Sequence, residues 1–122
     1  MAFSEHTNLD VTTWSDLVAN ASPELLLAST ATLLGLEADN SQNTDDSYLK
    51  LWNIATVPSV GSSVPDWVFR IKGGEKLLLQ FDSDGTGVAM STGVALACVT
   101  AGGTAGTTSP TNNVLVTLKT AA

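Results

Sequence analysis

The feature that most limits the fold of this chain is the close spacing of its turn residues. From about residue 25 onward, clusters of Gly, Pro, Asn, Asp and Ser separate short apolar runs. No amphipathic segment of helix length connects one run to the next, and a parallel α/β fold requires such helices. Short apolar runs at this spacing predict an all-β fold, an antiparallel sandwich or a small barrel.

Seven or eight strands are expected in this part of the chain. Residues 66–72 show the alternation most clearly, with Trp67 and Phe69 directed inward and Arg70 directed outward. Gly73-Gly74 then predicts a hairpin turn. The expected strands are 30–39, 47–54, 66–72, 76–81, 88–90, 94–100 and 113–120. The predicted core consists of large apolar residues from these strands: Trp52, Trp67, Phe69, Leu77, Leu79, Phe81, Leu96, Val114, Val116 and Leu118.

The first 23 residues lack this strand pattern. We therefore divide the chain into an N-terminal arm, 1–23, that is extended or short-helical, and a β-sandwich or jelly-roll-like domain, 24–122. Apolar groups on a flexible segment gain free energy only when they are buried, so the apolar residues of the arm are candidate partner-binding residues. They are Phe3, Leu9, Trp14, Leu17 and Val18. Trp14 packs either on the chain's own sheet or on a neighbouring molecule, and the sequence leaves both open.

The charge balance limits the possible partners. Five Lys and Arg residues stand against twelve Asp and Glu residues, for a formal net charge of −7 among 122 residues. Nucleic acid and anionic membrane surfaces are bound through Lys and Arg, so neither is an expected partner. No apolar run reaches the roughly 18 residues of a membrane span, and the N-terminus lacks the basic and apolar regions of a secretory signal.

No metal, cofactor or catalytic site is predicted. The single His6 lies in the arm, and the single Cys98 lies in an apolar run that favours a buried thiol. Residues 82–85 begin like a calcium loop, but the twelfth position is Gly93 instead of the required Glu. A turn is the preferred interpretation, with a weak calcium site shared with another loop or subunit as the alternative. The carboxylate pairs, Asp45-Asp46 and Asp82/Asp84, fall on loops, so a hydrolase has the least support.

Several turn and strand motifs together resemble a known group of proteins. The motifs are Asp39-Asn40-Ser41, Tyr48-Leu49-Lys50-Leu51-Trp52-Asn53, Pro58-Ser59-Val60-Gly61, Pro65-Asp66 and Ser91-Thr92-Gly93-Val94. In spacing they resemble small virion proteins of tailed bacteriophages, in which a β-sandwich or jelly-roll module decorates the capsid or forms part of a head or tail appendage. The likeness covers about two-thirds of the chain and includes no active-site signature.

This resemblance implies a non-enzymatic structural protein of the virion, assembled in the host cytoplasm. The expected function is that of a capsid decoration (cement) protein that binds the major capsid protein or another virion protein. The resemblance also implies a homo-oligomer, with a trimer favoured. The alternative is a head-fibre or tail-associated module that recognises a host-surface glycan or protein, for which Trp14, Asp45 and Asp46 are candidate contacts.

Overall fold

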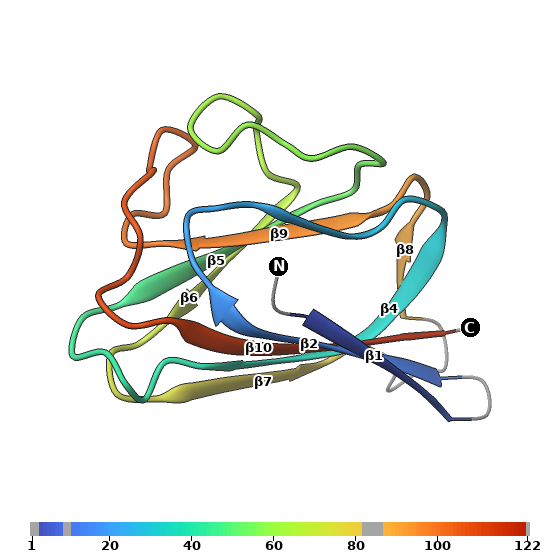
Figure 1. Cartoon of the computed structure of the whole chain (residues 1–122), viewed down its shortest axis with the longest axis horizontal. Coiled ribbons are helices and arrows are strands. Elements are labelled where there is room, and N and C mark those ends of the chain that lie inside the picture. The colour runs from blue at the N-terminus through green and yellow to red at the C-terminus, as the bar shows by residue number, and fades with distance from the viewer. Residues whose placement is uncertain (1–2, 9–10, 82–86, 122) are drawn as a thin grey trace.

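Two antiparallel β-sheets form the fold (Figure 1). The computed structural model describes residues 3–8, 11–81 and 87–121, and for residues 3–8 it describes the backbone. The described residues form ten strands and no helix: β1 (Phe3–Asn8), β2 (Val11–Ala19), β3 (Glu24–Leu27), β4 (Ala31–Asp39), β5 (Ser47–Trp52), β6 (Trp67–Ile71), β7 (Lys76–Gln80), β8 (Val88–Met90), β9 (Val94–Val99) and β10 (Val114–Ala121). Accordingly, this part of the chain contains no helix able to cross a membrane.

Sheet A has the strand order β1-β2-β10-β4-β7, and β8 pairs with the beginning of β4. Sheet B has the order β3-β9-β5-β6. Among the described strands, only β1–β2 and β5–β6 are hydrogen-bonded pairs that follow one another in the sequence. The chain repeatedly passes from one sheet to the other, and the two sheets lie as two layers in Figure 1. This arrangement confirms the expected all-β class with two antiparallel sheets.

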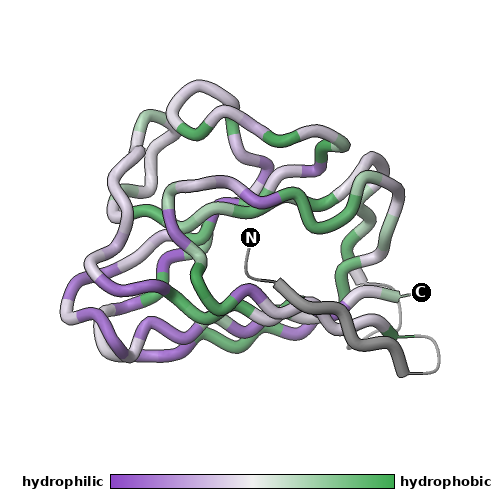
Figure 2. Tube along the Cα trace, viewed as in Figure 1, coloured by the Kyte–Doolittle hydropathy of each residue, from purple (hydrophilic) through white to green (hydrophobic). Residues whose placement is uncertain are grey.

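The main core lies between the two sheets. Alternate residues of β10 are directed inward, as are Leu49 and Leu51 of β5, while all six residues of β9 are buried. A run that is buried on both faces reads as continuously apolar, and Figure 2 shows hydrophobic residues along β9 and hydrophilic ones at the turn between β4 and β5. A smaller cluster, Trp52 with Ala95 and Ala97, packs separately from the main core.

Of the two conformations expected for the arm, extended or short-helical, the described part of residues 1–23 shows the extended one and no helix, because residues 3–8 and 11–19 form β1 and β2. β2 pairs with β10 on one side and with β1 on the other. The buried positions of β2 are Thr12, Trp14, Asp16 and Ala19. Two of these four are polar, so the hydrophobic alternation that normally marks a strand is missing from the sequence.

Trp14 packs on its own chain. Its side chain is buried in the main core, and the indole Nε1 donates a hydrogen bond to Thr120 Oγ1 of β10 at 3.1 Å. Of the two possibilities that the sequence left open, the structure therefore shows the intramolecular one. A buried indole N–H normally requires such a partner.

The expected hairpin at Gly73-Gly74 is a connection between sheets. β6 is the edge strand of sheet B and β7 is the edge strand of sheet A, so the turn crosses one open side of the sandwich. Gly74 has a φ of 79°, and a Cβ on Gly73 would lie 2.1 Å from the carbonyl oxygen of Thr44. Glycine is required at both positions, for the left-handed backbone and for the close approach.

The predicted core is confirmed for half of its members. The buried ones are Trp52, Leu96, Val114, Val116 and Leu118. The half-buried ones pack against the core but retain solvent contact: Trp67, Phe69, Leu77, Leu79 and Phe81. The latter come from β6 and β7 or directly follow them, so they lie at the sheet edges, where no further strand covers them. The rings of Phe69 and Phe81 lie 6.4 Å apart between centroids.

These burials predict different costs for truncating two tryptophans. Trp14→Ala removes a buried ring and its hydrogen bond, and we expect the free energy of unfolding to fall by about 3–5 kcal/mol. Trp67→Ala removes a half-buried ring at a sheet edge and should cost less. Urea denaturation of the two variants measures the difference. An equal or larger loss for Trp67→Ala would show that the edge of sheet B is packed more tightly than described.

Candidate functional site

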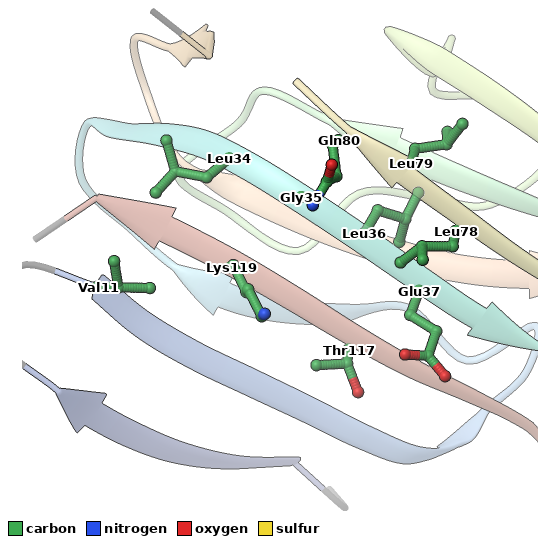
Figure 3. Close-up of a pocket in the computed structure, with 10 residues that line it drawn as sticks. All are labelled: Val11, Leu34, Gly35, Leu36, Glu37, Leu78, Leu79, Gln80, Thr117 and Lys119. Atoms are coloured by element: carbon green, nitrogen blue, oxygen red, sulfur yellow. The ribbon is translucent and has the colours of Figure 1, made fainter. Parts of the chain in front are cut away.

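The main candidate site is a groove on the outer face of sheet A, which we call the sheet A groove (Figure 3). It encloses about 270 Å³ and crosses the middle of β4, with β10 on one side and β7 on the other. The lining residues are Val11, Leu34, Gly35, Leu36, Glu37, Leu78, Leu79, Gln80, Thr117 and Lys119.

The groove exists because β4 has a glycine at its middle. Gly35 is opposite Lys119 of β10 and Gln80 of β7, and the register between β4 and β10 shifts beside it. A Cβ at Gly35 would meet only the carbonyl oxygen of Leu79, at 3.4 Å. A side chain would therefore occupy open space here, which is why the sheet surface is hollow at this point.

The rim of the groove is amphipathic. Leu78 of β7 is 69% exposed, an unusually solvated position for a leucine on a sheet. Lys119 and Glu37 lie on neighbouring strands, each outside the ion pairs found among the described residues. The groove thus offers an apolar contact, one ammonium and one carboxylate, a combination suited to holding a segment of another protein.

A second, polar depression lies at the loop between β4 and β5. It is bordered by Thr44, Asp45, Asp46, Tyr48 and Thr100. Asp46 accepts hydrogen bonds from Arg70 Nε at 2.8 Å and from the Gly73 amide at 3.0 Å. The Gly73 amide and, to a lesser extent, the Arg70 guanidinium hold the pKa of Asp46 below its ordinary value. Asp46 is therefore fixed by its own chain, whereas the Asp45 side chain is exposed at the rim.

Asn40 gives this loop its shape. It is completely buried, and its Nδ2 donates to the carbonyl oxygens of Asp45 and Ile71 at 3.0 and 3.1 Å. Its Oδ1 accepts hydrogen bonds from Asn43 Nδ2 and Ser47 Oγ at 2.9 and 2.8 Å. The polar residues around position 40 predicted a turn, but they gave no indication that the side-chain amide of Asn40 is buried and fully hydrogen-bonded.

This network leads to a test. Asn40→Ala leaves several buried donors and acceptors unpaired, each at a cost of about 1–3 kcal/mol before the loop relaxes. We expect the free energy of unfolding to fall by about 2–4 kcal/mol. Gln42→Ala is the matched control, because Gln42 lies in the same loop with an exposed side chain. Chemical denaturation should show little change for the control, and a small loss for Asn40→Ala would contradict the network's role.

Of the five predicted partner-binding residues, the structure describes the side chains of three, and these three do not share one exposed surface. Trp14 is buried and Val18 is half-buried. Leu17 is 58% exposed and lies near the end of β2, whereas the groove residue Val11 lies at its beginning. Phe3 belongs to β1, whose backbone alone is described, and Leu9 lies outside the described residues. Trp14 is therefore not available as an exposed contact, while Leu17 remains one.

The other residues considered from the sequence have no shared site in the part of the chain that the structure covers. His6 is in β1, and Asp82 and Asp84 lie outside the described residues. Cys98 is buried, and its burial, together with the nearby charge of Asp16, raises the pKa of its thiol to about 12. Among the described residues, no group of three or more His, Cys, Asp and Glu side chains is placed to hold a metal ion.

The sheet A groove was missed because its residues come from four strands that are distant in sequence. A single glycine in a strand indicates a bulge or a close backbone approach, so Gly35 was the one available signal. Comparisons with protein-family models, with curated proteins and with solved structures found no match for this chain.

Proposed function

We propose that the protein is a non-enzymatic structural protein of a virion, a capsid decoration (cement) protein that binds the major capsid protein and stabilises the shell. Its place is in the assembled virion, as a homo-oligomer, with a trimer favoured. The proposal rests on the resemblance of its turn and strand motifs to small virion proteins of tailed bacteriophages. The repeated passage of the chain between two sheets supports the finer assignment to a jelly-roll-like module.

Beside that resemblance, the sheet A groove is the structural observation that supports the proposal. A decoration protein has to present one face of a folded domain to its scaffold. The outer face of sheet A offers a groove with a solvated leucine beside it, and burying a leucine side chain is worth about 1.5–3 kcal/mol. Lys119 and Glu37 at the same groove add charges that fix the orientation of a partner.

Binding to particles tests the function and the groove separately. Mass spectrometry of purified virions should find the protein at a copy number comparable with that of the major capsid protein, and its absence from particles would refute the proposed function. In a reconstitution assay with particles that lack the protein, Leu78→Asp should weaken binding by about 10-fold or more, since about 1.4 kcal/mol corresponds to tenfold.

Two further variants show which surface is used. Val64→Asp is the matched control, because Val64 is 73% exposed but lies in the loop between β5 and β6, away from sheet A. It should bind particles as the unmodified protein does. Leu17→Asp examines the alternative contact on β2. If Leu78→Asp binds particles normally and Leu17→Asp does not, the contact lies on β2 and not at the sheet A groove.

The polar depression favours a second candidate, a head-fibre or tail-associated module that recognises a host-surface glycan. Tyr48 and Asp45 border the same depression, and an aromatic ring with carboxylate and hydroxyl groups matches the apolar face and the hydroxyls of a sugar. A glycan-array signal that is lost in Asp45→Asn would support this candidate. Array silence, together with particle binding, would reject it.

A further inference from the structure

The edge of sheet A along β7 carries little protection against pairing with another strand. β7 pairs with β4 on one side, and no strand of the described residues pairs with its other side. Proteins usually shield such an edge with a proline, a bulge or charged side chains. The five residues of β7 include no proline and pair with β4 without a register shift, and their one charge, Lys76, stands at the first position. The central residue, Leu78, is 69% exposed.

The hydrogen bonds to β4 show which backbone groups of β7 face the free edge. The amide of Phe81, directly after β7, donates to the carbonyl oxygen of Leu34 at 2.8 Å. Along an antiparallel strand, residues that bond to the neighbouring strand alternate with residues whose N–H and C=O groups point the other way. Counting back from Phe81, the residues that direct both backbone groups to the free edge are Lys76, Leu78 and Gln80.

The edge of sheet B, formed by β6, is less open. Its Val68 is 39% exposed, well below the exposed fraction of Leu78. Arg70 of β6 forms an ion pair with Asp46 at 2.8 Å, so one of its outward side chains is engaged with its own chain. Of these two edges, β7 is therefore the one that presents a solvated leucine at its centre.

We propose that β7 is a self-association edge, at which a second copy of this chain pairs its own β7 antiparallel about a two-fold axis at Leu78. A two-fold contact requires a surface that is complementary to itself. With Leu78 opposite Leu78 of the second copy, Leu77 lies opposite Leu79, and Lys76 lies opposite Gln80. Each facing pair is then apolar with apolar or ammonium with amide, and no like charges meet.

The backbone selects the same centre as the side chains. The residue on the two-fold axis has to direct its N–H and C=O groups toward its counterpart, and Leu78 does so. On the core side, Leu77 and Leu79 are half-buried because no strand covers the edge of the sandwich there. The pairing covers both of them, removes Leu78 from solvent, and continues sheet A from one copy into the other.

This inference does not rest on the proposed function, because it concerns two copies of the chain in solution. A two-fold strand pair closes with two copies, so it makes a dimer. The trimer favoured above needs a different surface. The experiments use no particles, and their failure is therefore distinct from a failure of the proposed function.

Sedimentation velocity of the full chain at concentrations up to about 1 mM measures the dimer and its Kd. Two changes at Gln80, whose side chain is exposed, test the register. Gln80→Glu places a carboxylate opposite Lys76 of the other copy, twice in each dimer, and should lower the Kd about threefold or more. Gln80→Lys places ammonium groups opposite each other and should raise the Kd by a similar factor.

General charge repulsion predicts the reverse order, because Gln80→Glu adds to a net charge of −7 and Gln80→Lys reduces it. Ser62→Glu and Ser62→Lys are the matched controls, since Ser62 is exposed in the loop between β5 and β6 and should follow that general order. A monomer at about 1 mM, a trimer that is indifferent to the Gln80 changes, or the same order of Kd values at both positions would overturn the proposal.

A change to the backbone gives an independent outcome. Proline is tolerated on an edge strand where the missing N–H would face solvent. Leu78→Pro should therefore fold, as circular dichroism can show, and sediment as a monomer at concentrations at which the unmodified protein is a dimer. A folded Leu78→Pro that still forms the dimer would contradict the proposed pairing. If this variant does not fold, the two Gln80 variants decide.

Discussion

Sheet A depends on β10, which pairs with β2 on one side and with β4 on the other. Leu118 of this strand lies opposite both Trp14 and Leu36, so one residue of β10 contributes to the core where the two halves of the sheet meet. The bond from Trp14 to Thr120 adds a side-chain connection to the backbone ladder. The sheet A groove depends on the same pairing. Gly35, which has no side chain, lies opposite Lys119 of β10 and Gln80 of β7, and the sheet surface is hollow between these two residues.

The sequence predicted the strands whose inward residues are apolar. β8 was predicted with its observed bounds, and β4, β5, β6, β7, β9 and β10 were predicted within one or two residues. β2 was missed because Thr12 and Asp16 occupy inward positions and remove the hydrophobic alternation. Tertiary pairing with β10 makes it a strand all the same, and the short run before β2 becomes a strand by pairing with it.

The sequence predicts where a strand lies along the chain better than it predicts which of the two sheets the strand joins. The Gly73-Gly74 signal is the same whether the next strand returns to its neighbour or crosses to the other sheet, since turn chemistry is local and sheet membership is not. The sheet A groove could not be predicted for the same reason, because a local sequence pattern does not show which strands lie side by side. The polar interior was hidden for a related reason: Asn40, Asp16 and Lys50 carry side chains that are normally solvated.

Lys50 shows how such a residue is accommodated. It is buried on β5, and its Nζ donates to the carbonyl oxygens of Thr104 and Gly106 at 3.2 and 2.9 Å. Desolvation lowers its pKa. These hydrogen bonds attach the loop between β9 and β10 to β5 of sheet B. The loop that leads into β10, the strand on which sheet A depends, is therefore held in place by sheet B. Five of the six residues of β5 are buried, so both faces of this strand are covered.

The position of β10 has a consequence for the order of events on the ribosome. The four strands of sheet B have all been made once residue 99 is synthesised. At that stage sheet A exists only as two separate pieces, β1–β2 and β4 with β7 and β8, and each has an unpaired edge facing the gap. Until residues 114–121 emerge, the nascent chain exposes those edges and the apolar side chains that β10 covers. We therefore expect chaperone contact and misassembly to be favoured for as long as β10 has not paired with these edges.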